Sequence, residues 1–155
     1  MEVTRAASLI AATITTGLIA GLFFAFTYSV MPGLAQTTDR TFVEAMQRIN
    51  VAIVNGWFLS CFLGALVFGI VATAFNFGNG AVFGWALAGT VCYVATLIIT
   101  VRFNIPLNDA LPAAVPDDPG AIRRQFEAPW IRWNLLRVVT SLGAFGCLVG
   151  ALVTR

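Results

Sequence analysis

The pattern of hydrophobic and polar positions divides the chain into long apolar runs separated by short charged segments. No charged residue occurs in 6–38, 49–101 or 138–154. A helix that crosses a bilayer needs about 20 mostly apolar residues, so these runs supply one, two and one spans respectively. The central run must turn back on itself, and the Asn- and Gly-rich stretch 75–80 suits a tight turn. We therefore predict four spans, near residues 6–30, 51–75, 81–103 and 132–153.

These spans predict an all-α fold. Helices satisfy every backbone donor and acceptor inside lipid, and no alternating ten-residue strands indicate a barrel. Small residues recur at a spacing of four along the spans, which favours close packing of helices; examples are Gly17 with Gly21, Ser60 with Gly64, and Gly146 with Gly150. We predict a single domain, 1–155, that is an integral membrane four-helix bundle with short interfacial helices in two loops on one side. A homo-oligomer is compatible with this pattern.

Composition supports the membrane prediction and excludes several kinds of chemistry. Charged residues are 10% and hydrophobic residues 59% of the chain, whereas soluble proteins have roughly 25% and 45–50%. The net charge of +2 is spread over the loops, so nucleic acid is not an expected partner. Histidine is absent, which removes Ser-His-Asp catalysis, His-ligated haem and most zinc sites. We predict no metal and no cofactor.

The cysteines and the start of the first span have simple interpretations. Cys61, Cys92 and Cys147 each lie inside an apolar run without C-x-x-C spacing, and we expect small buried hydrophobes. The segment 33–35 resembles a signal-peptide cleavage site, but the apolar stretch before it is too long for a signal peptide. We therefore predict a true first span.

With four spans, both termini lie on one side and the loops 31–50 and 104–131 lie together on the other. Seven of the nine arginines lie in or beside these loops. The positive-inside rule then places the loops in the cytoplasm, although the same loops carry six of the seven acids.

The first loop predicts a helix that starts at Asp39 or at a capping box from Thr41 to Glu44. Glu44 and Arg48 are spaced as an ion pair, and one apolar stripe runs along the helix: Phe42, Met46, Ile49 and Ile53. Gln47 and Asn50 share a different face. Two interpretations stay open: an interfacial helix that runs into the second span with solvated amides, or amides that face a pocket.

The second loop predicts another helix, which starts at Pro119 after the acidic Asp118. Arg123 and Glu127 are spaced to pair, and Pro129 is expected to restart the helix. Trp130 and Trp133 follow where an aromatic belt is expected; stacking on a flat ligand is the alternative role.

Arg137 lies about one turn inside the fourth span, three residues after Asn134 and on the same helical face. A charge there is costly unless it snorkels to the interface or finds a partner, and intramembrane ionisable groups are functional candidates. Arg102, at the end of the third span, faces the same choice.

Pro106 interrupts helical geometry just after the third span. We therefore expect Asn104 to cap that span and Asn108 or Asp109 to start the next turn, with a ligand-facing role for the amides as the alternative. Asp109 is the carboxylate nearest to this end of the bundle along the chain.

The chain resembles the anthrone oxygenase family of small four-span membrane proteins. The resemblance rests on a set of motifs in order along most of the chain: Phe24-x-Phe26, Met31-Pro32, Phe42 with Met46-Gln47-x-Ile49-Asn50, Asn104-Ile-Pro-Leu-Asn-Asp109, and Trp130-x-x-Trp133-Asn134-x-x-Arg137. It implies oxidation of polyketide anthrones to anthraquinones by molecular oxygen, without an evident cofactor. It also implies an integral protein of a bacterial plasma membrane whose partners are membrane lipid and a hydrophobic aromatic small molecule.

On this resemblance the polar residues of the loop side receive roles. Arg137 and Asn134, with Arg102, Asn104 or Asn108, would hold the substrate's carbonyl oxygen. Asp109 or Glu44, or a water molecule, would take the proton. The remaining substrate-binding candidates are aromatic walls and amides: Trp130, Trp133, Phe24, Gln47 and Asn50. The alternative is a non-catalytic membrane protein that binds a lipid, a quinone or a partner protein; a transporter fits less well, because broken helices and internal repeats are not evident.

Overall fold

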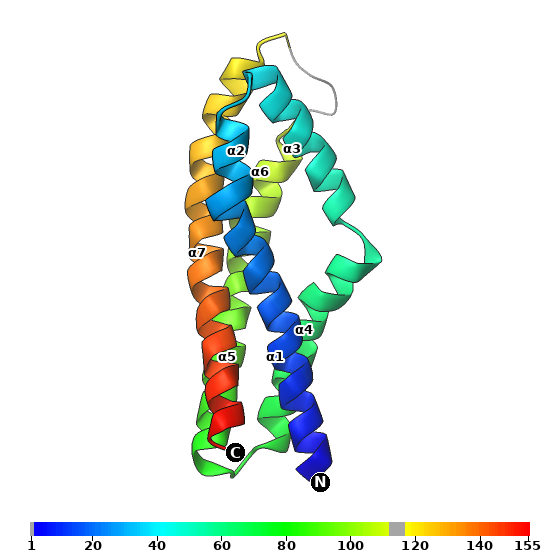
Figure 1. Ribbon diagram of the computed structural model, residues 1–155, viewed down its shortest axis with the longest axis vertical. Helices are drawn as coiled ribbons and strands as arrows, with labels where there is room; N and C mark the ends of the chain where they lie inside the picture. Colours follow the sequence, from blue (N-terminus) through cyan, green and yellow to red (C-terminus); the bar gives the residue numbers. More distant parts are fainter. Residues whose placement is uncertain (1, 112–116) are drawn as a thin grey trace.

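The computed structural model describes residues 2–111 and 117–155. Within these ranges four helical arms are long and apolar enough to cross a membrane, namely Glu2–Ala35, Gly56–Phe75, Gly80–Asp109 and Pro119–Val153. They form a bundle with both termini and the 76–79 turn at one end (Figure 1). The predicted all-α membrane four-helix bundle is confirmed, and both long loops lie at the same end.

Two of the arms continue through a proline by way of a wider helical turn. The first arm consists of α1 (Glu2–Ala25), the π-helical segment η1 (Phe26–Val30) and α2 (Met31–Ala35). The third consists of α5 (Gly80–Ile99), η2 (Thr100–Asn104, also π-helical) and α6 (Ile105–Asp109). In each, the wide turn lies just before a proline, whose ring would clash with the carbonyl four residues earlier in a regular α-helix.

The helices of these arms continue past the predicted span ends near 30 and 103, to Ala35 and Asp109. The backbone of Asn104 is helical and its side chain makes no capping hydrogen bond. Pro106 lies within the arm, which continues to Asp109, so neither Asn104 nor Asn108 interrupts the arm. The wide turn accommodates the proline, and the helix has no need to stop.

The second arm is broken where a continuous helix was one of the expectations. α3 (Asp39–Ile53) ends before Val54, and α4 (Gly56–Phe75) begins after Asn55, so the helix is interrupted just after the predicted span start near residue 51. The Asn55 side chain satisfies backbone on both sides of the break, because it accepts from Phe58 N at 3.0 Å and donates to Ala52 O at 2.8 Å. At the break the arm bows away from the rest of the bundle (Figure 1).

α3 starts at Asp39, which is one of the two predicted starts, although a different residue caps it. Thr38 is its N-cap and its hydroxyl accepts from Thr41 N at 3.2 Å. Glu44 pairs with Arg40 at 3.0 Å in place of Arg48. The apolar stripe is confirmed, because Phe42 and Met46 are buried and Ile49 and Ile53 pack on the same cluster.

The last arm is one helix, α7 (Pro119–Val153). Asp118 caps it by accepting from Ala121 N at 2.9 Å, as predicted. Pro129 lies inside the helix, so the expected restart at that residue is wrong. Arg123 pairs with Glu127 at 2.7 Å, as predicted, and also with Asp39 at 2.9 Å, which joins α7 to the start of α3.

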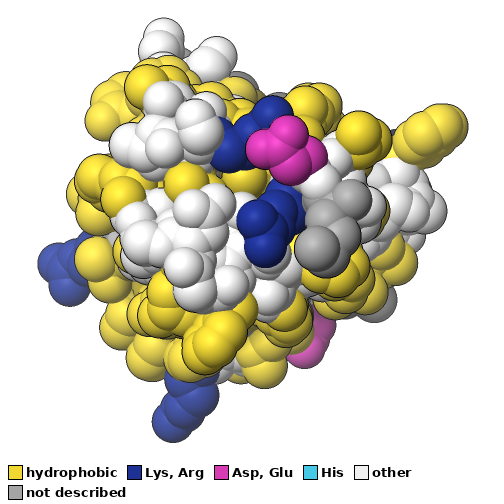
Figure 2. Space-filling view, turned by 90° about the horizontal axis from the view of Figure 1, so that it is seen from below, with side chains coloured by type: hydrophobic (Ala, Val, Ile, Leu, Met, Phe, Trp, Pro, Cys, Tyr) yellow, Lys and Arg dark blue, Asp and Glu magenta, His cyan; other side chains and the backbone are white. Residues whose placement is uncertain are grey.

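The outer surface of the bundle is apolar. Large hydrophobic side chains are exposed along all four arms, among them Ile14, Leu63, Ile98 and Val139. Seen from the end that carries the termini, hydrophobic side chains occupy most of the margin and a few charged groups gather near the middle (Figure 2). This distribution suits a molecule surrounded by lipid.

Candidate functional site

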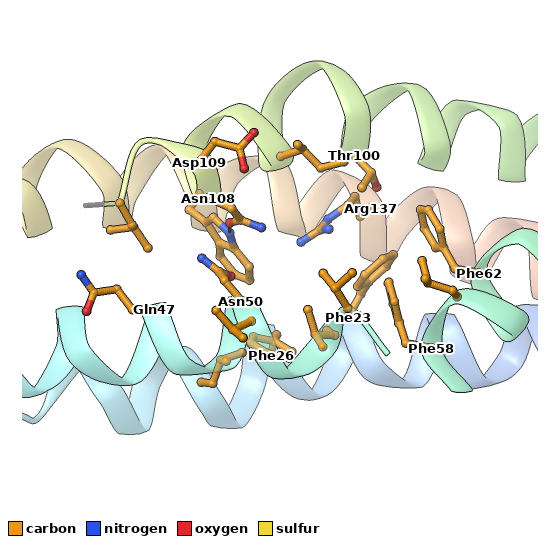
Figure 3. Close-up of a pocket in the computed structure, with 18 residues that line it drawn as sticks. Phe23, Phe26, Gln47, Asn50, Phe58, Phe62, Thr100, Asn108, Asp109 and Arg137 are labelled. Carbon is orange, nitrogen blue, oxygen red and sulfur yellow. Dashed lines mark hydrogen bonds between the residues drawn. The ribbon is translucent and has the colours of Figure 1, made fainter. Parts of the chain in front are cut away.

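A cavity of about 650 Å³ lies at the loop end of the bundle, beneath the break between α3 and α4 (Figure 3). Pockets for small molecules are typically of about 300–1,000 Å³. Most of the wall is apolar, with aromatic rings from Phe23, Phe26, Phe58, Phe62 and Trp130. Its polar lining residues are Gln47, Asn50, Thr100, Asn108, Asp109 and Arg137.

Arg137 is the buried cation of this cavity, with 6% of its surface exposed. Its Nη2 donates to Asn134 Oδ1 at 2.7 Å, and its Nε is buried with no hydrogen-bond partner among the described residues. The guanidinium lies 4.2 Å from the centre of the Phe23 ring and 5.4 Å from that of Trp130. Burial decides between the two interpretations of Arg137: the side chain stays inside the bundle and does not snorkel.

Asn134 orients Arg137 and does not itself line the cavity. Its Nδ2 donates to Phe23 O at 3.0 Å and to Thr27 Oγ1 at 2.7 Å, where α1 gives way to η1. These two bonds fix which end of the amide is the oxygen, and that oxygen accepts from Arg137. The spacing of three residues on α7 therefore couples the arginine to the first arm.

Trp130 and Asn108 form the second polar pair. Trp130 Nε1 donates to Asn108 Oδ1 at 2.8 Å, so the Asn108 amide presents its NH₂ group as the remaining donor. Trp130 is buried within the bundle, so its side chain does not form part of an aromatic belt on the outer surface. Asn104 is fully buried beside it, with Nδ2 at 3.5 Å from Trp130 O, but does not line the cavity.

Amides and one carboxylate complete the polar lining. Gln47 and Asn50 both face the cavity from α3, so the pocket-facing interpretation holds for this pair. The Nδ2 of Asn50 is buried and has no partner among the described residues. Asp109 is exposed at the end of α6 and is the only carboxylate among the described lining residues.

The comparison with protein families decides the membership of the chain. The model of the anthrone oxygenase family matches residues 51–147, more than half of the sequence. The chain belongs to the anthrone oxygenase family. Comparisons with curated proteins and with solved structures give no match.

The family match covers much of the cavity of this anthrone oxygenase family member. It includes Asn108, Asp109, Trp130 and Arg137. The lining residues from α1, η1 and most of α3 lie before it. In the part of the chain that the structure describes, no three Cys, Asp or Glu side chains come together as ligands for a metal ion.

Three sequence-predicted residues lie away from the cavity, on the outer faces of their helices. Phe24 is exposed and pairs with Tyr28, with ring centroids 4.4 Å apart. Trp133 stacks on Phe103 at 3.5 Å, and the exposed Arg102 lies 5.6 Å from the same Phe103 ring. Glu44, the alternative base, is paired with Arg40 and does not line the cavity either.

The structure adds cavity residues that sequence reasoning missed: Phe23, Phe58, Phe62 and Thr100. Phe23 and Phe24 are neighbours in the sequence, yet only Phe23 faces inward. In a helix surrounded by lipid both faces are apolar, so no polar face marks which ring is inside. Thr27 was also missed, and the polar position it occupies in an apolar run was the available signal.

Proposed function

We propose that this protein oxidises a flat aromatic, anthrone-type substrate with molecular oxygen and without a cofactor. The observation that carries the proposal is the apolar cavity with Arg137 buried in its wall, where it pairs with no acid among the described residues. Burying such a cation in an empty apolar site costs free energy. Negative charge that develops beside the cation during the reaction offsets this cost. Membership of the anthrone oxygenase family supports the same reaction class.

The chemistry requires little from the protein. The benzylic C–H of an anthrone is acidic, because its anion is an enolate delocalised over three rings. The anion gives electrons to oxygen to form a hydroperoxide at the benzylic carbon, and loss of water then leaves the quinone carbonyl. Anthrone and one O₂ thus become anthraquinone and one water.

Asp109 is the proposed base, since it is the carboxylate at the cavity mouth. Its exposed position allows the proton to pass on to water. General-base catalysis of this kind contributes about 10²–10⁴-fold to a rate.

Arg137 and the Asn108 amide are the proposed donors to the substrate oxygen as it becomes negative. Asn134 holds Arg137 in place and acts as a positioning residue. The rings of Phe23, Phe26, Phe62 and Trp130 would enclose the aromatic body and exclude water, which strengthens every hydrogen bond to the developing charge.

The test is aerobic turnover of an anthrone by purified protein in lipid nanodiscs, with oxygen uptake and quinone absorbance measured together. We expect one quinone per O₂ consumed, at a rate well above that of empty nanodiscs. Asp109→Asn should reduce the rate, whereas Asp117→Asn, an acid outside the cavity lining, should not. Tight anthrone binding without oxygen uptake would contradict the oxygenase and favour the alternative, a binding protein for an aromatic lipid or quinone.

A further inference from the structure

The cavity contains a buried cation that forms no ion pair in 2–111 and 117–155, although the exposed carboxylate of Asp109 also lines the cavity. The ion pairs among the described residues join Arg40 with Glu44, and Arg123 with Asp39 and Glu127. Arg137 takes part in none of them, although only 6% of its surface is exposed. Its contacts are an amide oxygen and two aromatic rings.

Several hydrogen-bond donors of the cavity have no acceptor among the described residues. Arg137 Nε and Asn50 Nδ2 are both buried without a partner in 2–111 and 117–155. Asn108 has its oxygen engaged by Trp130, so its NH₂ group faces away from that bond. Figure 3 shows Arg137, Asn108 and Asn50 extending from α7, α6 and α3 into one part of the cavity. A neutral hydrocarbon would leave all of these donors unsatisfied.

The rim of the cavity is apolar on the side of the α3–α4 break. Val51 and Val54 line the cavity and are 79% and 66% exposed, and Ile105 on the opposite side is 41% exposed. An opening between such residues suits a ligand that is dissolved in the bilayer. The body of the ligand is therefore apolar, and its polar end is the part that reaches Arg137.

We propose that the ground-state ligand of this cavity is an aromatic anion, an apolar ring system with one ionised oxygen such as a phenolate or a carboxylate. Arg137 binds that oxygen before any reaction, with donors from Asn50 and Asn108. The inference rests on the same cavity as the proposed function and deepens it, because it makes the ionised form of the molecule the bound form. It does not require turnover.

The test measures equilibrium binding of two probes that are not anthrones. Anthracene carboxylate is the anion and anthracene methanol its neutral counterpart, each titrated by fluorescence into protein in phosphatidylcholine nanodiscs, with partition into empty nanodiscs subtracted. We expect the carboxylate to bind about tenfold more tightly or better, since hydrogen bonds to charged groups are the strong ones. Equal affinities would overturn the proposal.

Substitutions assign the preference to one side chain. Arg137→Gln should abolish the preference for the carboxylate, Arg137→Lys should retain part of it, and Arg102→Gln, which changes an exposed arginine, should leave it unchanged. A preference that persists in Arg137→Gln would also overturn the proposal.

If that variant fails to fold, the wild type still gives an answer with a phenol that ionises near neutral pH. Its affinity should rise with pH as the phenol ionises, and a fall would contradict the proposal.

Failure of this inference is distinguishable from failure of the proposed function. If the protein prefers the carboxylate but consumes no oxygen with an anthrone, the anion site is supported and the oxygenase function is contradicted. If the protein oxidises the anthrone but binds both probes equally, the oxygenase function is supported and the anion site is contradicted.

Discussion

The two ends of the bundle use similar apolar sequences to opposite effect. At the end with the 76–79 turn, regular helices meet through small residues. A Cβ atom on Gly89 would lie 3.1 Å from Ala144 O, and one on Gly69 would lie 3.0 Å from Thr90 Oγ1. At the loop end, two arms contain wide turns, one arm is broken, and large rings surround a cavity of about 650 Å³.

This difference shows why a cavity forms at one end of a small membrane bundle and not at the other. Alanine and glycine let backbones touch, and no space remains between them. Aromatic side chains on bent or broken helices cannot fill the interior so closely, and two polar atoms there, Arg137 Nε and Asn50 Nδ2, have no hydrogen-bond partner among the described residues. The loop end is therefore less closely packed than the other end, and it contributes less to stability in the region where a ligand would bind.

The largest expected effect is at the loop end. Arg137→Gln should reduce the turnover number for anthrone oxidation by about 100- to 1,000-fold, the usual result of removing one oxyanion donor. The free energy of unfolding should change little, because the guanidinium forms no ion pair with any described residue. The measurements are initial rates of quinone formation and denaturant unfolding in detergent. Arg102→Gln is the matched control and should change the rate by less than about twofold.

At the other end the expected effect is on stability. Gly89→Ala places a methyl group 3.1 Å from the Ala144 carbonyl and the Leu148 side chain. We expect the free energy of unfolding to fall by about 1–3 kcal/mol. Gly84→Ala, where nothing lies within 4 Å, should change it by less than about 0.5 kcal/mol. Equal results for the two variants in a detergent unfolding titration would contradict the close contact between α5 and α7.

The break in the second arm should have an intermediate effect. Asn55→Ala removes the cap of α4, which we expect to cost about 1 kcal/mol of unfolding free energy. Asn55→Ser keeps an oxygen that can accept from Phe58 N and should lose less. A neutral result for Asn55→Ala in the same titration would mean that the break does not depend on this side chain.

The smallest expected effect separates two adjacent rings. Phe23→Leu removes the ring that lies 4.2 Å from the Arg137 guanidinium. We expect kcat/KM to fall by an amount that corresponds to a loss of about 0.5–2 kcal/mol of transition-state stabilisation. Phe24→Leu changes an exposed ring and should leave kcat/KM unaltered. The reverse order in steady-state kinetics would place the substrate on the outer face of α1.

Much of the fold follows from charge and length. The charge-free runs give four spans, and the Asn- and Gly-rich stretch gives the turn between α4 and α5. The spacing of Asn134 and Arg137 places them on one face, and the 2.7 Å hydrogen bond agrees. These features depend on local sequence or on the membrane alone, so they can be read from the chain.

The ends of the spans and the inner faces depend on more than local sequence. At Pro106 the local rule favours a stop, but a wide turn upstream lets the helix continue. The break at Val54 and Asn55 is marked only by the Asn55-Gly56 pair, a turn signal that sequence reasoning missed because it lies inside a long charge-free run. Arg102 and Arg137 are both arginines near span ends, and only packing decides that one is exposed and the other buried.

The most direct test of the central claim compares Arg137→Gln with Arg102→Gln for oxygen uptake with an anthrone in lipid nanodiscs. The account predicts that the wild type and Arg102→Gln consume oxygen and form quinone in equal amounts at similar rates, while Arg137→Gln is nearly inactive although folded. Equal rates for all three proteins, or no uptake above empty nanodiscs by any of them, would contradict it.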